Sequence, residues 1–405
     1  MTIILVVHET PLPALDGMIA GEIAAERGAR FVTLVTGGGG HARFDCVLHV
    51  LAHGELAPNG VLWAERASDR AVASPVDRGA VARLADEIVV VPINPHLAAH
   101  AEAMARISAT VAAAGRALEI HNVIEVDGHY EVRLEGTQTP HAIWRLDRYG
   151  RPVRLDENTA EPASLRELRI VMVGDEACMR EVYPANLAAL GDAADALGLS
   201  LILTFVDPRA VPPPVWEQAL NEADGLVLPG GSDMEQVRGQ TEAARIAIRR
   251  DLPTVGLCLG MQTMATAVAQ EICGFNDANL AEADPSAQTK TFVRLHDEHG
   301  RPEFRVGLQP CRVVPGSQLA ALIAGATSID IHYNHRFVLD AALEKRLSQA
   351  GLSVSGWQAE RDLADAIEVP ALRFFIGMQG HPELSSRRDR PHPLITGFLT
   401  AASGA

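Results

Sequence analysis

The stretch that most restricts how this chain can fold is Gly256-Leu257-Cys258-Leu259-Gly260. An apolar run, Leu252 to Val255, leads into it, and a helical pattern, Met261 to Glu271, follows it. A cysteine between two glycines at a strand-to-helix turn is held on a sharp bend with its sulfur exposed. The start of the following helix favours the thiolate, which is the reactive form of cysteine. The pattern predicts Cys258 as a nucleophile at the end of a buried strand, rather than one more buried structural cysteine.

A possible partner for this cysteine lies far downstream, where His381-Pro382-Glu383 follows a second apolar run, Phe374 to Met378. A histidine can take the proton of a thiol, and a carboxylate two residues further on can orient that histidine. Alone, the two residues have the pattern of a surface pair. Together with Cys258, they are expected to be catalytic, with His381 as base and then acid and Glu383 fixing its tautomer.

The second half of the chain alternates strands and helices, which predicts an α/β fold with a mostly parallel sheet covered by helices. Sites in such sheets lie at the carboxyl ends of the strands. Cys258, Gly231 and His381 all follow apolar runs, so we expect them to meet at that edge. The expected elements are strands at 168–173, 201–206 and 225–228, and helices at 180–197 and 242–250.

Three ordered motifs give this half a specific resemblance. Leu228-Pro229-Gly230-Gly231, then Gly-Leu-Cys-Leu-Gly-Met-Gln at 256–262, then His381-Pro382-Glu383 resemble the class I glutamine amidotransferases. Within that class, the chain from about Leu168 onward looks most like the glutaminase domain of CTP synthase. Lesser matching motifs are Asp277-Ala278-Asn279 with Glu282, His335-Arg336, Gly351 to Gly356, and Pro391-His392-Pro393-Leu394.

This resemblance implies hydrolysis of L-glutamine through a glutamyl thioester on Cys258, with no metal and no organic cofactor. It implies that the backbone N–H groups of Gly231 and Leu259 form the oxyanion hole; the alternative for Gly230-Gly231 is a plain turn with positive φ. It also implies the residues that contact glutamine, which are Gly230, Gly231, Leu259, Gly260, Met261, Gln262, Glu282 and Arg336. The segment Glu235 to Gly239 exchanges the charges usual in the nucleotide-sensitive lid of CTP synthases, so activation by GTP is not expected.

The lysine content bears on the partner of this glutaminase, because Lys290 and Lys345 are the only two lysines. Neither follows a glycine-rich turn, as the lysine of a phosphate-gripping P-loop must. We therefore expect no ATP-dependent ligase, and an ammonia acceptor on the first domain or on a partner synthase. That acceptor would be nucleotide-related if the chain also resembles CTP synthase in its pathway, pyrimidine nucleotide biosynthesis. The alternatives are a γ-glutamyl amide hydrolase that releases an amine, and a non-catalytic binding or regulatory module.

The first half of the chain resembles no family that we can name. Its patterns predict a smaller α/β domain over residues 1–158 with hairpins at 124–132 and 144–155, followed by a linker and a second domain over 167–405. Strands are expected at 3–7, 31–35 and 87–93, and helices at 14–27 and 96–114. His8, His41, His96 and His100 could approach one another, but their spacing lacks the glutamate of zinc hydrolase helices, so we expect no metal. Gly37 to Gly40 could hold an anion or be a turn.

The composition bears on the binding partners and the cellular compartment of the protein. A net charge of −16 argues against nucleic acid or an anionic membrane as a partner. The five scattered cysteines fit a reducing cytoplasm, and the apolar N-terminus indicates a first strand and not a signal peptide. The oligomeric state stays open, with a homo-oligomer among the options.

Overall fold

The computed structural model describes residues 2–35, 48–58, 60–84, 87–155, 165–209 and 213–404. The chain divides into two compact units. Unit 1 holds residues 1–162 and 179–188, and unit 2 holds residues 163–178 and 189–405. The predicted linker lies mostly within 156–164, outside the described residues, so the predicted domain limits stay a prediction. None of the described helices is long and apolar enough to cross a membrane.

Over its described residues, unit 1 contains a seven-stranded sheet in the order β2-β5-β1-β6-β7-β8-β9. β2, β5, β1 and β6 run parallel, whereas β6 to β9 form an antiparallel meander. The strands are β1 (Thr2–His8), β2 (Arg30–Phe31), β5 (Val89–Ile93), β6 (Ala117–Val126), β7 (His129–Leu134), β8 (Ala142–Leu146) and β9 (Pro152–Arg154), with a separate hairpin of β3 (Leu48–Val50) and β4 (Leu56–Pro58).

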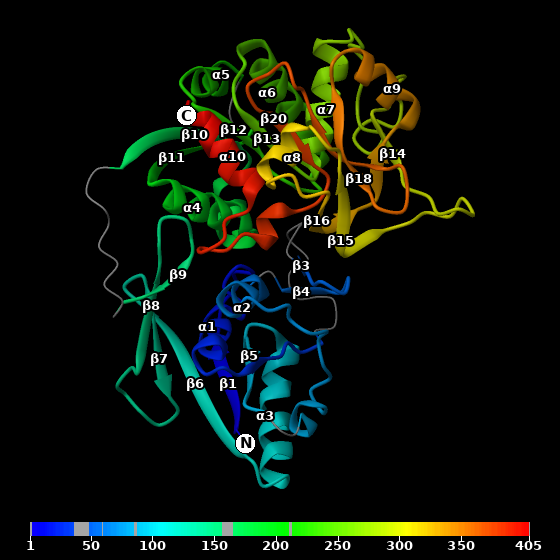
Figure 1. The fold of residues 1–405 in the computed structure, drawn as a ribbon. Coiled ribbons are helices and arrows are strands. Elements are labelled where there is room, and N and C mark those ends of the chain that lie inside the picture. The colour runs from blue at the N-terminus through cyan, green and yellow to red at the C-terminus, as the bar shows by residue number, and fades with distance from the viewer. Residues whose placement is uncertain are drawn as a thin grey trace. The chain divides into compact units, whose positions relative to one another are not determined.

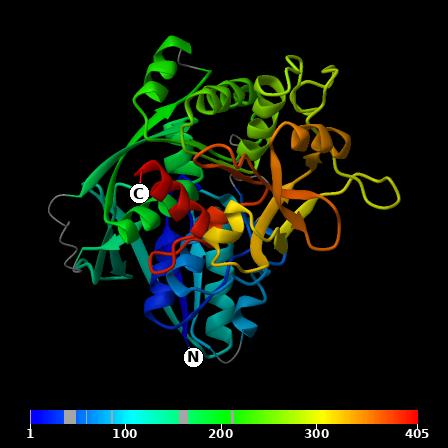
Figure 2. The same cartoon turned by 45° about the horizontal axis from the view of Figure 1, so that its top comes forward.

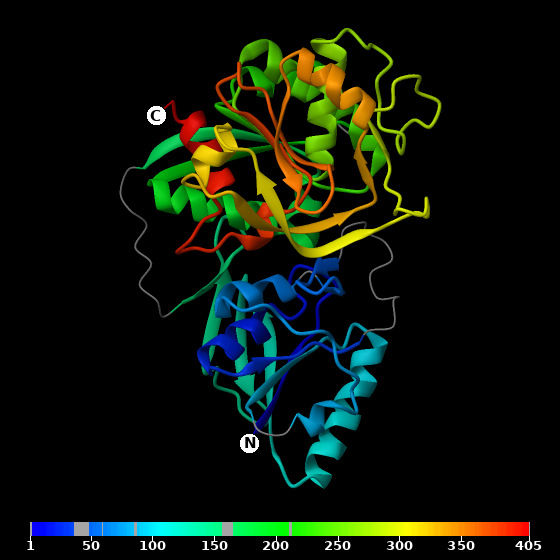
Figure 3. The same cartoon turned by 45° about the vertical axis from the view of Figure 1, so that its right-hand side comes forward.

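Helices cover both faces of this sheet. Successive side chains of a strand point to opposite faces, and in β1 the side chains on both faces are apolar and buried. Ile4 and Val6 of β1 pack with α1 (Met18–Glu26) and α2 (Val61–Ser68), whereas Ile3 and Leu5 pack with α3 (Ala98–Ala113). Figure 3 shows α1 and α3 on opposite sides of the strands. A short 3-10 helix, Val81–Arg83, lies on the α3 side.

The two predicted hairpins of unit 1 are confirmed. β6 and β7 are joined by Asp127 and Gly128, whose φ angles of 47° and 81° are the left-handed pair that an Asp-Gly turn supplies. β8 and β9 flank the predicted bend at Tyr149-Gly150. The strand predicted over 31–35 is shorter, because β2 ends at Phe31 and only an isolated bridge follows at Leu34. Gly37 to Gly40 and His41 lie outside the described residues.

In unit 2, the described strands form a nine-stranded sheet in the order β11-β10-β12-β13-β20-β19-β18-β15-β16. The first five strands in this order are mutually parallel, and the other four are antiparallel to their neighbours. The strands are β10 (Arg166–Val173), β11 (Leu199–Val206), β12 (Gly225–Leu228), β13 (Thr254–Leu257), β15 (Arg305–Val313), β16 (Ser328–His335), β18 (Ser353–Gln358), β19 (Ala364–Glu368) and β20 (Phe375–Met378), with a separate ribbon of β14 (Phe292–Arg294) and β17 (Phe337–Leu339).

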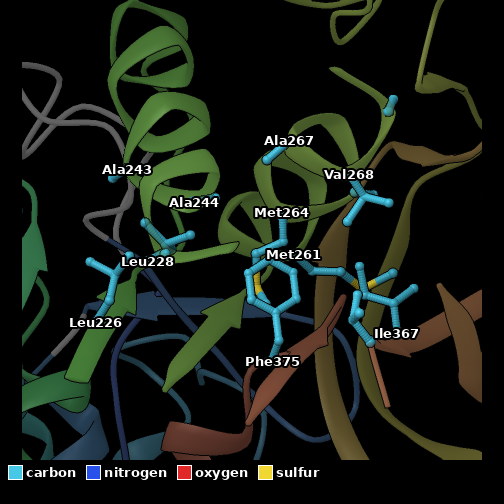
Figure 4. Close-up of a cluster of buried hydrophobic side chains, with 14 of the residues drawn as sticks. Leu226, Leu228, Ala243, Ala244, Met261, Met264, Ala267, Val268, Ile367 and Phe375 are labelled. Atoms are coloured by element: carbon cyan, nitrogen blue, oxygen red, sulfur yellow. The ribbon is translucent and has the colours of Figure 1, made fainter. Parts of the chain in front are cut away.

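The main core of unit 2 lies between this sheet and two helices. Leu226 and Leu228 of β12 face Ala243 and Ala244 of α6 and the methionines of α7 (Figure 4). Gly225 faces the other way, toward Phe398 of α10, and α10 lies across the strands from α6 and α7 (Figures 1 and 2). The helices are α4 (Ala185–Leu197), whose first four residues belong to unit 1, α5 (Pro213–Asn221), α6 (Val237–Arg250), α7 (Leu259–Glu271), α8 (Gln318–Leu322), α9 (Ala341–Gln349) and α10 (Pro393–Ala402), with 3-10 turns at Met234–Gln236 and Pro382–Ser385.

The prediction of one helix over 180–197 is wrong in its first turns. A π-helical turn, Cys178–Val182, comes first, and α4 begins only at Ala185. Pro184 stands between the two, and a proline disfavours helical geometry at the residue before it and donates no hydrogen bond. The apolar periodicity across 180–197 is real, but the backbone must restart after this proline.

Candidate active site

Cys258 occupies a strained turn between β13 and α7. β13 ends at Leu257, α7 begins at Leu259, and Cys258 has φ 50° and ψ −104°. Such a backbone is costly for a residue with a side chain and persists only where the surroundings enforce it. The surroundings here are close packing at the two flanking glycines. A Cβ on Gly260 would lie 2.0 Å from the Leu228 carbonyl oxygen, and one on Gly256 would lie 2.3 Å from the Met264 sulfur.

Three neighbouring parallel strands bring the predicted loops together. β12 pairs with β13 and β13 pairs with β20, so the loops after these strands leave the same edge of the sheet. Gly230 follows β12, Cys258 follows β13 and His381 follows β20. A Cβ placed on Gly230 would lie 3.1 Å from His381 Cε1 and 3.4 Å from Cys258 Cβ. The fold therefore places these three residues in one cluster.

Close packing, and not backbone conformation, explains the glycine at position 230. The alternative interpretation of Gly230-Gly231 as a positive-φ turn is wrong, because neither residue is among the glycines with positive φ. Gly230 has no room for a side chain without moving His381 or Cys258, whereas a Cβ on Gly231 would meet only Leu259 Cδ2 at 3.8 Å.

His381 is held from two sides. Its backbone N–H donates to the His332 carbonyl at 2.7 Å, and its Nδ1 lies 2.8 Å from Glu383 Oε1. Glu383 is completely buried in the turn that follows. Because Nδ1 faces the carboxylate, Nε2 is the ring nitrogen left for Cys258, whose charge acts on this ring.

The charge on His381 follows from these neighbours. Burial opposes the imidazolium, but the charges of Cys258 and Glu383 outweigh burial and raise the pKa of His381 well above its ordinary value. A protonated imidazole beside this sulfur favours a thiolate–imidazolium pair, which is the form in which a cysteine attacks. His335, which is also buried nearby, has its pKa lowered to about 3 by burial and by the charge of Arg305, so it stays neutral.

A further residue in contact with the sulfur is Gln379, which the sequence analysis missed. Its buried side-chain amide lies with Nε2 3.8 Å from Cys258 Sγ, and its Oε1 accepts a hydrogen bond from Gln262 Nε2 at 3.3 Å. The available signal was its position directly after the apolar run and two residues before His381. The predicted substrate residue Gln262 thus turns its side chain toward Gln379.

The predicted oxyanion-hole residues are neighbours in space. Leu259 is the first residue of α7, and the first N–H groups of a helix have no acceptor inside the helix. Gly231 lies in the loop after β12, beside the Leu259 side chain. The start of α7 adds its positive dipole end to the same place. An anion formed next to Cys258 would meet a favourable field here.

Glu282 and Arg336 come together through the β14–β17 ribbon. The backbone N–H of Ala281 donates to Phe292 O, and that of Leu295 donates to Arg336 O. Burial raises the pKa of the Glu282 carboxyl, and the charges of Arg336 and Arg294 oppose this shift. The charge of Arg336 thus acts on the Glu282 carboxyl, and the role of both side chains as contacts for an amino acid substrate stays a prediction.

The histidines of unit 1 do not assemble a metal site among the described residues, where no three suitable side chains meet. His100 Nδ1 instead accepts the Asn94 backbone N–H at 3.0 Å. His41, the remaining member of the predicted set, lies outside the described residues.

Comparison with known proteins places this chain in a family. The family model for glutamine amidotransferase class-I matches residues 196–401. The chain belongs to the class I glutamine amidotransferases. The match includes Gly230, Cys258 and His381, the three residues that the sheet edge brings together.

Within this glutamine amidotransferase family, the chain is similar in sequence to CTP synthases. The CTP synthase of Acidobacterium capsulatum is 34% identical over 291 residues, which are 69% of this chain and 52% of that protein. The CTP synthase of Rubrobacter xylanophilus is 34% identical over 244 residues, or 59% of this chain and 44% of that protein. The chain thus spans about half the length of the curated relatives it matches.

A solved structure of a CTP synthase domain is also similar to this chain. The glutaminase domain of Trypanosoma brucei CTP synthase with bound acivicin superposes with a TM-score of 0.55 at 26% identity, covering 58% of this chain and 94% of that one. The amidotransferase domain of this chain therefore resembles the CTP synthase glutaminase domain in sequence and in fold.

Proposed function

We propose that unit 2 hydrolyses L-glutamine to glutamate and ammonia, with Cys258, His381 and Glu383 as its catalytic residues. One observation supports the proposal: a cysteine on a strained strand-to-helix turn lies beside a histidine whose Nδ1 lies 2.8 Å from a buried carboxylate. This arrangement is the nucleophile, base and orienting group of covalent amide hydrolysis.

In the first half of the reaction, the Cys258 thiolate attacks the side-chain amide carbon of glutamine. The carbonyl π electrons move to oxygen, and the N–H groups of Gly231 and Leu259 hydrogen-bond the resulting oxyanion. His381 gives its Nε2 proton to the amide nitrogen, the C–N bond breaks, and ammonia leaves. Removing one donor from an oxyanion hole typically costs about 3–4 kcal/mol of transition-state stabilisation.

In the second half, neutral His381 takes a proton from a water molecule, whose oxygen attacks the thioester carbon. The second tetrahedral intermediate collapses with cleavage of the C–S bond. The electron pair returns to Cys258 as thiolate, glutamate leaves, and the thiolate–imidazolium pair is restored. Glu383 carries the charge that favours the imidazolium in each cycle.

For substrate recognition, we propose that Glu282 binds the α-ammonium of glutamine and that Arg336 binds its α-carboxylate. Opposite charges on these two side chains match the two charges of a free amino acid. Gly230, Gly231, Leu259, Gly260, Met261 and Gln262 contribute the walls and the backbone of the pocket. Unit 2 needs no metal and no organic cofactor for this chemistry.

We also propose that the ammonia aminates a nucleotide-related acceptor held by unit 1 or by a partner synthase. The relatives in support carry the name CTP synthase, and this chain matches about half of their length. The acceptor itself would be found by adding candidate synthases and nucleotides to the purified chain and measuring glutamine consumption.

Turnover of glutamine tests the central proposal. Wild type and Cys258→Ala are compared for ammonia release from glutamine and for amine release from N-substituted γ-glutamyl amides. Cys273→Ala is the matched control, because Cys273 lies just past the far end of the same helix, α7. We expect Cys258→Ala to lose release and labelling by a glutamine-like diazo-ketone, while Cys273→Ala keeps both.

Two results would change the conclusion. Equal rates for wild type and Cys258→Ala would remove the enzymatic proposal and leave a binding module. A clear preference for the substituted amides over glutamine would identify a γ-glutamyl amide hydrolase that uses the same three residues.

A further inference from the structure

The Gln379 side chain is placed where it can act on the nucleophile. Gln379 directly follows β20 and is completely buried, with its backbone N–H donating to the Asp365 carbonyl at 2.8 Å. Its Nε2 lies 3.8 Å from Cys258 Sγ. A buried amide N–H group needs an acceptor, and here the sulfur is that acceptor.

The orientation of this amide is fixed by a second glutamine. Gln262, the fourth residue of α7, donates its Nε2 hydrogen to Gln379 Oε1 at 3.3 Å. With its oxygen engaged by this donor, the Gln379 amide presents its N–H to Cys258. The reverse orientation keeps the bond between the two glutamines only if Gln262 also turns its amide round, and it would point an oxygen at the sulfur.

We propose that Gln379 is a catalytic residue of unit 2 that donates a hydrogen bond to the Cys258 thiolate, and that Gln262 is the positioning residue that keeps this donor pointed at the sulfur. The inference rests on the proposed function, because it gives Gln379 a part in the same reaction. A hydrogen bond to a charged acceptor is stronger than one to a neutral acceptor. Gln379 therefore favours the thiolate over the thiol before attack, and favours its departure when the thioester breaks.

The pH dependence of Cys258 alkylation by iodoacetamide tests this without any turnover. The reagent is uncharged, only the thiolate reacts, and the Cys258 peptide is followed by mass spectrometry between pH 5 and pH 10. In Gln379→Met, which keeps the length of the side chain and removes the N–H, we expect the pH of half-maximal alkylation to rise by about one unit. We expect kcat for glutamine to fall by about tenfold near neutral pH, with KM little changed.

Two further variants make the test specific. Gln379→Glu puts a carboxylate beside the sulfur and should move the midpoint up further than Gln379→Met does. Gln262→Met should move it in the same direction by less, and the double variant Gln262→Met with Gln379→Met should equal Gln379→Met alone, because both act through one hydrogen bond. This lack of additivity is expected if Gln262 affects Cys258 only by positioning the Gln379 amide.

Gln240→Met is the matched control, because Gln240 is equally buried but its amide donates to the Pro229 carbonyl and does not contact the sulfur. It should leave the alkylation midpoint where it is in the wild type. A midpoint that is the same in wild type and in folded Gln379→Met and Gln379→Glu would overturn the inference. An equal shift of the alkylation midpoint in Gln240→Met would also overturn it, because it would indicate a general effect of removing a buried side-chain amide.

Failure here and failure of the proposed function give different results. If the wild type hydrolyses glutamine and the midpoint does not move in the Gln379 variants, only this inference is lost. If the wild type does not hydrolyse glutamine but the midpoint moves as expected, Gln379 still acts on the thiolate and the proposed substrate is wrong.

Discussion

Asn94 in unit 1 and Gln379 in unit 2 hold the same place in two different sheets. Each is a completely buried amide directly after a parallel strand, β5 and β20 respectively. Asn94 Oδ1 accepts from the backbone N–H groups of Thr10 and His96, both at 3.1 Å, and its Nδ2 donates to Thr10 O at 2.9 Å. Gln379 instead bonds two side chains, one of which carries the candidate nucleophile.

The difference shows how a buried polar group at a strand end should be interpreted. An amide whose partners are backbone groups of its own loops ties those loops together, which is a structural role. An amide whose partners are a buried glutamine and a cysteine on a strained turn can change the reactivity of that cysteine. Burial alone is the same in both cases, so the partners decide between stability and chemistry.

The largest expected effect is a loss of activity in unit 2. Glu383→Gln removes the charge that helps hold the His381 proton, so burial should then lower the pKa of His381, and we expect a loss of about 10²–10⁴ in kcat/KM for glutamine. The measurements are ammonia release and an NMR titration of the His381 ring.

The matched control for Glu383→Gln is Glu368→Gln. Glu368 is also a buried carboxylate of unit 2, but it accepts from the backbone N–H groups of Gln318 and Leu319 at the start of α8. We expect a stability cost without loss of turnover. An unchanged His381 titration in Glu383→Gln would contradict the assignment of Glu383.

The next effect, in unit 1, is one of stability. Asn94→Ala removes a buried amide and leaves the Thr10 and His96 backbone groups without their partner, which should cost about 3 kcal/mol of unfolding free energy. Amide hydrogen exchange, resolved by unit, is the measurement. Asn94→Asp keeps two acceptor oxygens and loses only the donor, so it should cost less.

Glutamine turnover per folded molecule should be the same in both Asn94 variants and in the wild type. A change in turnover that exceeds the change in folded fraction would break the comparison, because it would give Asn94 a part in the chemistry.

A smaller effect concerns the space between the loops of unit 2. Gly230→Ala places a Cβ 3.1 Å from His381 Cε1 and 3.4 Å from Cys258 Cβ, so one of these residues must move. We expect kcat/KM to fall by about tenfold, because small misplacements of reacting groups are costly. Gly231→Ala has room for its Cβ and should lose less, and the reverse ranking would show that the cluster is arranged differently in solution.

The smallest effect is a pH dependence of opposite sign in the two units. Burial lowers the pKa of His8 below about 6.5, against the charge of Asp16 and a hydrogen bond to Leu15. Between the folded pKa and 6.5, the unfolded chain binds more protons, so His8 makes unit 1 lose stability as pH falls through this window. For His381, whose pKa is raised, the contribution is present below 6.5 and is lost as pH rises through its folded pKa.

Substitution isolates the His8 contribution. We expect His8→Leu to reduce the loss of unit 1 stability between pH 7 and pH 5, measured by hydrogen exchange at the two pH values. An unchanged pH dependence in this variant would show that other histidines, such as His141, account for it.

Local sequence patterns were enough to predict much of unit 2. The glycines around Cys258 predicted the strained turn because only a residue without a Cβ fits at positions 256 and 260. The apolar runs before Gly230, Cys258 and His381 predicted that all three follow buried strands. The helix over 180–197 failed in its first turns because periodicity does not register that Pro184 ends one backbone segment and starts another.

The sequence by itself determined the parts of this protein that depend on a few consecutive residues: the nucleophile turn, the alternating strands and helices around it from 225 to 271, and the Asp-Gly hairpin of unit 1. Only the tertiary structure decided which residues touch across long separations. It placed Gln379 and Gln262, 117 positions apart in the chain, side by side, and it bonded the Asn94 side-chain amide to the backbone of Thr10 and His96. The physical reason is that contacts between distant residues depend on strand order and side-chain direction, which are set when the sheet assembles.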